Sequence, residues 1–149
     1  AFEPAFVAPR VMGTRAHQLA MFVVYESPLQ MVADSPDMYV DADGADFIAD
    51  VPASWDETRV LAGAIGEHIV IARRKGKDWY LGAMTNEQAR TLDVSLAVLG
   101  KGAWAATSWS DGDAPTDVLR TQRVLASSDK LTLALKASGG AVVKLSPTE

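Results

Sequence analysis

From residue 55 to the C-terminus the chain is a succession of short alternating segments, and this pattern constrains the fold more than any other feature. Apolar residues recur at every second position within each segment, which is typical of strands that bury one face. The predicted strands span residues 55–61, 68–74, 78–84, 90–96, 103–110, 118–125, 131–136 and 141–145. Short strands at roughly 10-residue spacing predict an antiparallel β-sandwich of about eight strands.

Polar turns separate these segments. Lys75-Gly76-Lys77 joins two of the predicted strands and makes the clearest hairpin in the sequence. Further turns are predicted at residues 111–115, 127–129 and 138–140.

The first third of the chain has helical patterns instead. Thr14 is positioned to cap a helix over residues 15–26. Ser27-Pro28 with Gln30, and then Ser35-Pro36, resemble two further helix starts. Asp43-Gly44 precedes a short helix over residues 45–50 that Pro52 ends. The sequence therefore predicts a mainly β fold with two to four helices in front of it.

The predicted helix over residues 15–26 is apolar around most of its circumference, so it should be covered on all sides. A chain of 149 residues offers little such cover. Leaving large apolar side chains exposed costs about 1.5–3 kcal/mol each. We expect this helix to self-associate or to bind other parts of a larger protein. The residues expected to need such cover are Leu19, Met21, Phe22, Val23, Leu29, Met31 and Val32.

Charge is distributed unevenly along the chain. Residues 16–58 contain nine acids and no Lys or Arg, so the rest must carry +4 to give the total of −5. A compositional boundary thus falls near residue 58. The acidic pI of about 5.0 argues against nucleic-acid binding, which needs a basic surface.

Several further classes of protein are excluded by composition. The absence of Cys removes disulfide frameworks, thiolate metal sites and a cysteine nucleophile. The longest apolar run, residues 19–25, is far short of the about 20 residues that cross a membrane. The chain begins at Ala1 without an initiator Met or a signal-like segment, so we interpret it as an internal or processed piece.

Few residues in the chain have the spacing of a catalytic or metal site. His17 and His68 are isolated, and no phosphate-binding or nucleophile-elbow motif occurs. Asp41, Asp43 and Asp50 resemble part of a calcium loop, but Tyr39 occupies the first ligand position. An acidic loop with helix caps is the simpler interpretation.

Two glutamates are candidates for a catalytic carboxylate pair. Glu26 and Glu57 would suit a small glycosidase if the fold brought them together. The simpler interpretation is that Glu57 pairs with Arg59 at an interdomain contact beside Trp55.

Aromatic residues on the predicted strands are the candidates for binding sugar. Trp79, Tyr80, Trp104 and Trp109 have flat faces that could stack on sugar rings, although core packing is the more ordinary role. Because Trp79 and Tyr80 are adjacent on one strand, they face opposite sides of the sheet.

Runs of residues along the whole chain resemble glycoside hydrolase family 97. These are GTRAHQLAMFVVYESPLQM at 13–31, VP at 51–52, WDETRVL at 55–61, IARRKG at 71–76, DWYLGAMT at 78–85 and the Gly139-Gly140 turn. The resemblance implies that residues 1–52 are the closing helical segment of a (β/α)8 catalytic barrel with its linker. It implies that residues 53–149 are a C-terminal antiparallel β-sandwich domain.

The resemblance also implies a modular α-glycosidase with calcium in its barrel, acting on α-glucosides or α-galactosides in the periplasm or outside the cell. The family's catalytic and calcium-binding carboxylates lie upstream of this chain, so we expect the chain alone to be inactive and to bind the remainder of its parent enzyme. The alternative from another class is a free-standing carbohydrate-binding β-sandwich that uses the four aromatic residues.

Overall fold

A computed structural model describes residues 13–27, 29–32 and 35–148. The helices are α1 (Arg15–Val24), the 3-10 helix η1 (Pro36–Tyr39) and α2 (Ala45–Asp50). The strands are β1 (Glu57–Ala64), β2 (His68–Lys75), β3 (Asp78–Thr85), β4 (Arg90–Ser95), β5 (Ala103–Asp111), β6 (Val118–Ala126), β7 (Lys130–Leu135) and β8 (Gly140–Pro147).

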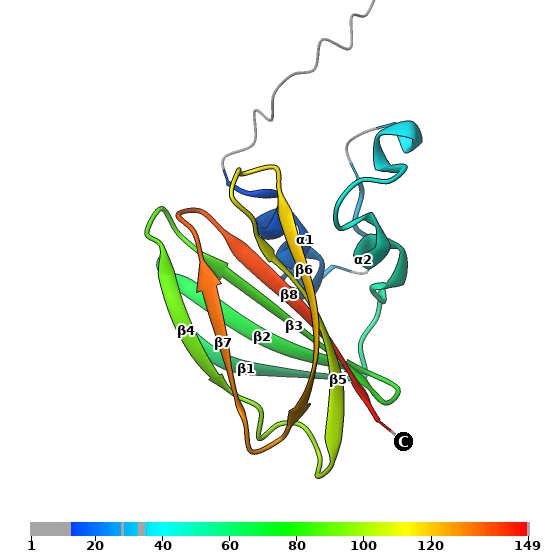
Figure 1. Cartoon of the computed structure of the whole chain (residues 1–149), viewed down its shortest axis with the longest axis vertical. Helices are drawn as coiled ribbons and strands as arrows, with labels where there is room; N and C mark the ends of the chain where they lie inside the picture. Colours follow the sequence, from blue (N-terminus) through cyan, green and yellow to red (C-terminus); the bar gives the residue numbers. More distant parts are fainter. Residues whose placement is uncertain (1–12, 28, 33–34, 149) are drawn as a thin grey trace, which may run out of the picture.

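The strands form two antiparallel sheets (Figure 1). Six strands make the larger sheet in the order β1-β2-β3-β8-β5-β6, and β4 and β7 make a separate pair. The predicted hairpin is confirmed: β2 pairs with β3 from His68 opposite Thr85 to Lys75 opposite Asp78. Gly76 turns the chain there with φ of 57°, a conformation that favours glycine.

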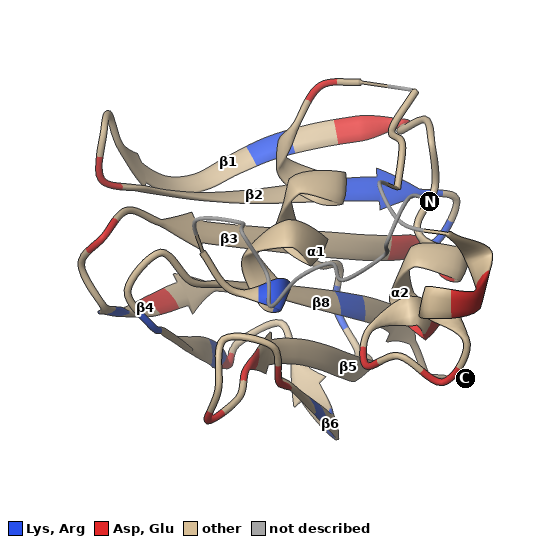
Figure 2. Cartoon of the chain, turned by 90° about the horizontal axis from the view of Figure 1, so that it is seen from above, with Lys and Arg blue, Asp and Glu red and all other residues tan. Residues whose placement is uncertain are grey.

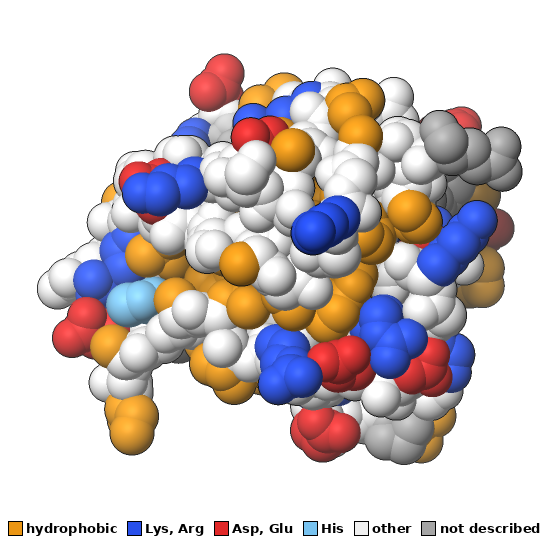
Figure 3. All heavy atoms as spheres, turned by 90° about the horizontal axis from the view of Figure 1, so that it is seen from below, with side chains coloured by type: hydrophobic (Ala, Val, Ile, Leu, Met, Phe, Trp, Pro, Cys, Tyr) orange, Lys and Arg blue, Asp and Glu red, His pale blue; other side chains and the backbone are white. Residues whose placement is uncertain are grey.

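The main core lies between these two sheets. Alternate residues of β2, β3, β5 and β8 are buried against alternate residues of β4 and β7, as the period of two predicts. Leu81 and Leu145 from the large sheet and Leu131 from β7 are almost fully buried. Leu61, Leu92 and Val98 are partly buried at the rim of this core. From below, hydrophobic side chains form a band that charged residues surround (Figure 3).

A second apolar cluster lies on the opposite face of the large sheet, where α1 packs against β3 and β8 (Figure 2). Leu19 and Val23 of α1 are buried there with Tyr80 and Val142 of the sheet. Gly82 allows the close approach, because a Cβ at that position would lie 2.8 Å from the Cβ of Val23.

This packing corrects one expectation. Leu19 and Val23 were expected to need cover from outside the chain, but the large sheet covers them. Both faces of β3 and β8 are buried. One face packs against β4 and β7, and the other packs against α1. Met21 and Phe22 are partly buried beside the same cluster.

The start of α1 is fixed to the sheet through Asp111 at the end of β5. Thr14 caps α1 as predicted, accepting a hydrogen bond from the His17 N–H at 3.1 Å. Its hydroxyl donates in turn to the Asp111 carboxylate. That carboxylate also accepts from the backbone N–H groups of Lys136 at 2.8 Å and Gly140 at 3.2 Å. One aspartate at the end of β5 therefore joins the helix to the turn between β7 and β8.

The prediction of a helix after Ser27-Pro28 is wrong for the described residues, since residues 29–32 are irregular. Pro28 itself lies outside the described residues. The Gln30 side chain donates to the carbonyl groups of Phe22 and Ser27, at 3.3 and 3.4 Å, instead of forming a capping box. It therefore satisfies a carbonyl near the end of α1. Within the described part of the chain, no helix has the length and apolar character needed to cross a bilayer.

Candidate functional site at the helix and sheet junction

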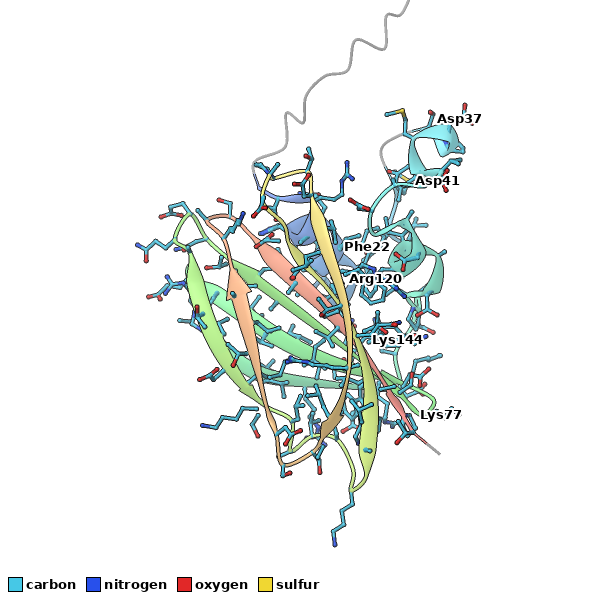
Figure 4. All side chains as sticks on the ribbon, viewed as in Figure 1. Phe22, Asp37, Asp41, Lys77, Arg120 and Lys144 are labelled. Atoms are coloured by element: carbon cyan, nitrogen blue, oxygen red, sulfur yellow. The ribbon has the colours of Figure 1, made fainter. Side chains whose placement is uncertain are left out.

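Three groups of side chains join the helical segment to the outer face of the large sheet. Each group contains an acid from the stretch without Lys or Arg, an aromatic ring, and a cation from the sheet. We call them the junction groups. They consist of Asp46, Trp109 and Arg120; of Asp50, Tyr80 and Lys144; and of Glu26, Trp55 and Arg73. Arg120 and Lys144 lie between the sheet and α2 (Figure 4).

The first junction group begins with Asp46 in the first turn of α2. One carboxylate oxygen accepts from the Trp109 indole at 2.9 Å, and the other pairs with Arg120 Nε at 3.1 Å. The Arg120 guanidinium also lies 5.6 Å from the centre of the Trp109 ring, within cation–π range. Phe47 packs against the same ring at 5.1 Å. These contacts hold α2, which at six residues is too short to be stable alone.

The second junction group fixes the other end of α2. Asp50 accepts from the Tyr80 hydroxyl at 3.1 Å and pairs with Lys144 Nζ at 2.7 Å. Burial raises the pKa of Tyr80, and Asp50 adds to this while Lys144 opposes it. Burial works against the charge on Lys144, but the hydrogen bond with Asp50 and the interactions with the charges of Tyr80 and Asp50 together outweigh it and raise the Lys144 pKa. An aspartate at a helix C-terminus is unfavourable, and Lys144 compensates for it.

The third junction group closes the end of α1. Arg73 has a side chain that is only 3% exposed, yet its partner Glu26, 2.9 Å away, is 87% exposed. Arg73 Nη2 also donates to the Val24 carbonyl at the end of α1, at 3.4 Å. The guanidinium lies 5.8 Å from the centre of the Trp55 ring, which meets Tyr80 edge-on at 5.3 Å. A cation at a helix C-terminus is favourable.

The junction groups explain the uneven charge of the sequence. The acids of the stretch 16–58 are not a separate acidic module, because five of them pair with cations of the sheet: the three in the junction groups, and Asp56 and Glu57. Sequence reasoning missed Arg73, Arg120 and Lys144, and the charge difference across residue 58 was the signal that could have found them.

The four candidate sugar-binding aromatic residues are buried. Their exposed fractions are 5% for Trp79, 3% for Tyr80, 7% for Trp104 and 4% for Trp109. Trp79 and Trp104 pack in the core between the sheets, while Tyr80 and Trp109 pack beneath the helices. None of the four rings offers an open face on which a sugar could stack.

The calcium candidates do not form a cluster. Asp50 is engaged by Tyr80 and Lys144, and no group of three potential ligands assembles among the described residues. Asp41 and Asp43 line a pocket of about 380 Å³, but Arg120 lines it too. A guanidinium beside the pocket is unfavourable for a divalent cation, so these residues do not fit calcium.

The predicted interdomain residues lie at the start of the large sheet. Glu57 pairs with Arg59 at 2.8 Å and with Arg74 at 3.2 Å, and these hydrogen bonds lower the Glu57 pKa. Trp55 is partly buried within the third junction group. Glu26 and Glu57 therefore bind different arginines and do not act as one carboxylate pair.

The two histidines lie at the starts of different elements, α1 and β2. His17 Nδ1 is hydrogen-bonded to the Gly139 carbonyl at 3.0 Å, which is a structural role at the start of α1. His68 begins β2 opposite Thr85, and its Nδ1 is buried without a hydrogen-bond partner among the described residues.

A second surface feature adjoins the junction. Six large hydrophobic side chains are exposed within residues 25–40, and we call this the apolar stretch. They are Tyr25, Leu29, Met31, Val32, Met38 and Val40. Leu29 and Met31 are 78% and 84% exposed. Such a concentration of exposed apolar residues indicates an interaction surface. Asp37 and Asp41, also exposed, lie in the same region (Figure 4).

Fold and junction together define a mainly β domain that carries its own helical segment and shows no catalytic constellation among the described residues. A family model described as "Glycosyl-hydrolase 97 C-terminal, oligomerisation" matches residues 54–146. The chain belongs to this family.

Relatives support the same assignment. The chain is 38% identical to a retaining alpha-galactosidase of Bacteroides thetaiotaomicron over 149 residues, covering 97% of this chain and 22% of the relative. It is 39% identical over 127 residues to a probable retaining alpha-galactosidase of Streptomyces bingchenggensis, covering 84% of this chain and 19% of the relative. The chain thus spans about a fifth of the length of these relatives.

Solved structures are similar too. A glycoside hydrolase family 97 enzyme from Pseudoalteromonas sp. strain K8, in complex with acarbose, matches with a TM-score of 0.86 and 43% identity, over 92% of this chain and 23% of the other. A beta-arabinopyranosidase matches with a TM-score of 0.75 and 29% identity, over 89% of this chain and 21% of the other.

Proposed function

We propose that this chain is the C-terminal part of an α-glycosidase of family 97, in which a catalytic barrel elsewhere in the polypeptide performs hydrolysis and this domain braces it. The observation that carries the proposal is coverage: nearly the whole chain aligns with about a fifth of a retaining alpha-galactosidase. In this proposal the chain contributes support, and the chemistry lies in the barrel.

The apolar stretch supports this proposal. Its side chains would lose little by burial against the barrel, and each large one would stabilise the contact by about 1.5–3 kcal/mol if fully covered. Within residues 1–52, helix α1 packs on the large sheet.

 The division itself, with residues 1–52 as the closing segment of the barrel and residues 53–149 as an antiparallel β-sandwich, is part of the proposal.

The names of the relatives favour particular substrates for the parent enzyme. The two curated relatives are named as retaining alpha-galactosidases, which favours an α-galactoside for the parent enzyme. The Pseudoalteromonas enzyme was solved with acarbose and with panose, so an α-glucoside is the second candidate. We propose a periplasmic or secreted parent enzyme with calcium in its barrel, outside the residues of this chain.

Assays of hydrolysis test the proposal. We expect no turnover of p-nitrophenyl α-galactoside or α-glucoside by the 149-residue chain, and turnover of one of them by a longer polypeptide that includes the upstream coding sequence. Turnover by the short chain that is lost in Glu26→Gln or Glu57→Gln would overturn the proposal, because it would place the chemistry in this domain.

The same samples test the carbohydrate-binding alternative. We expect no saturable heat in calorimetric titrations of the 149-residue chain with maltooligosaccharides or galactosides, because its four candidate rings are buried. Saturable binding that Trp79→Ala abolishes, with the fold intact by circular dichroism, would favour the free-standing module instead.

A further inference from the structure

The outermost strand β6 is an open edge of the large sheet. It pairs with β5 on one side, from Asp111 opposite Val118 to Ala103 opposite Ala126, without a register shift. No other described element pairs with its second side. Six consecutive residues, 119–124, are exposed, and Leu119 and Val124 among them are 54% and 65% exposed. A long, regular edge with exposed apolar residues is a template for pairing with another strand.

The other edges of the two sheets are better protected. β1, the opposite edge of the large sheet, has a register shift between Val60 and Ala62 that interrupts its pairing. Its Glu57 and Arg59 are engaged in ion pairs. The strands β4 and β7 have six residues each, against nine in β6. Of these edges, β6 is therefore the one best suited to accept a strand.

Side chains of β6 are already held by β5 and α2. Thr121 and Ser108 share a hydrogen bond at 2.6 Å, and Gln122 donates to Thr107 at 3.4 Å. The charge of Arg120 is paired with Asp46. An edge that is ordered before binding loses less conformational entropy when a partner strand is added.

We propose that two copies of this chain associate by antiparallel pairing of β6 with β6 across a two-fold axis, which joins the two six-stranded sheets into one. This inference rests on the proposed function, in which the domain braces the barrel, and adds the assembly of two copies to it. The family description includes oligomerisation, and the matched residues 54–146 contain β6 but not the apolar stretch.

Charge also favours self-association through β6 over self-association through the apolar stretch. A two-fold contact places a surface against itself. For the apolar stretch this would bring Asp37 and Asp41 toward their own copies, with no Lys or Arg anywhere in residues 16–58 to offset them. The edge of β6 has no such conflict.

The pairing register of β6 avoids facing like charges. Directly opposite residues in an antiparallel pair lie on the same face of the sheet, so the two-fold axis must pass through one residue of the strand. Thr121 and Gln122 lie near the middle of β6 and give the two registers with the most pairing. With Thr121 on the axis, Arg123 lies opposite Leu119 of the second copy. With Gln122 on the axis, Arg120 lies opposite Val124 of the second copy. Neither register places one arginine opposite another.

Single lysine substitutions test the proposal and distinguish these registers. Leu119→Lys creates two like-charge pairs with Arg123 if Thr121 is on the axis, and Val124→Lys creates two with Arg120 if Gln122 is on the axis. We expect the wild-type chain to dimerise in sedimentation equilibrium, and one of these variants to weaken the dimer about tenfold. Adding Arg123→Glu to Leu119→Lys should restore the dimer in the first register.

Matched controls separate failure of this inference from failure of the proposed function. Ile65→Lys changes a fully exposed apolar residue between β1 and β2, and Met31→Lys changes one in the apolar stretch. Neither should weaken the dimer. A dimer that survives both Leu119→Lys and Val124→Lys would overturn the β6 interface and leave self-association standing, and loss of the dimer in a control variant would place the contact elsewhere. A wild-type chain that is monomeric at every concentration would overturn both the β6 interface and self-association. The hydrolysis assays would still test, separately, whether the chain is part of an α-glycosidase.

Discussion

At the scale of single residues, the junction groups show how acids, rings and cations distant in sequence form one contact. Each acid pairs with a cation whose charge would otherwise lie unpaired beside an aromatic ring. The ion pairs themselves are partly exposed, and such pairs contribute about 0–1 kcal/mol each. Their larger effect is orientation, because they determine where α2 and the end of α1 lie on the sheet.

The second junction group predicts weaker folding at alkaline pH. The pKa values of Tyr80 and Lys144 are both raised in the folded state. Their contribution is present below the unfolded values of about 10 and 10.5 and is lost as the pH rises through the folded values. We expect the melting temperature to fall above about pH 10, more steeply in the wild type than in a Tyr80→Phe, Lys144→Met double variant.

Thermal melts by circular dichroism between pH 7 and 12 measure this difference. Lys77→Met is the control, because Lys77 is an exposed lysine in the turn between β2 and β3. An equal alkaline slope in the double variant and the wild type would count against a role for these two groups.

At the scale of elements, α1 belongs energetically to the sheet. It buries the outer face of β3 and β8, where Tyr80 and Val142 would otherwise face water. Hydrogen bonds fix α1 at both termini: Thr14 binds Asp111 at the start of the helix, and Arg73 binds the Val24 carbonyl at its end.

A truncation at the predicted domain boundary tests this. A chain of residues 53–149 loses the cover of Leu19, Val23 and Phe47, each of which would contribute about 1.5–3 kcal/mol by burial. We expect it to unfold at a much lower urea concentration, or to bind the dye ANS, whereas residues 13–149 should behave like the whole chain. Equal urea midpoints for the two truncations would show that the β strands fold without α1.

At the scale of the whole molecule, we expect two separate surfaces to bind two different partners. The apolar stretch lies with the helical segment, and the open edge of β6 belongs to the large sheet. Because the stretch is acidic and β6 is not, the two surfaces select partners of different charge.

The apolar stretch should affect the longer enzyme more than the isolated domain. We expect Leu29→Lys with Met31→Lys to leave the melting temperature of the 149-residue chain within about 2 °C, because both side chains are already exposed. In the longer polypeptide the same change should lower the temperature of inactivation, since it would place two charges against the barrel. Ile65→Lys is the matched control, and equal losses in both variants would argue against docking through this stretch.

The strands were the part of the fold most open to prediction. Their alternation depends on neighbours along the chain, and all eight are present near the predicted positions. The Thr14 cap of α1 and the limits of α2 followed equally from local residue types. The helix predicted after Ser27 failed because Gln30 binds carbonyl groups of α1 and of the adjoining turn, which a local capping rule does not consider.

The sequence alone determined the mainly β class, the succession of elements and the uneven charge, because periodicity and composition are properties of neighbouring residues. Only the tertiary structure decided what lies on each face of the sheet. It buried Trp79, Tyr80, Trp104 and Trp109, and it paired acids of one third of the chain with cations of the rest. These contacts join residues tens of positions apart, and their formation depends on the strand order and on the docking of α1, which no local pattern specifies.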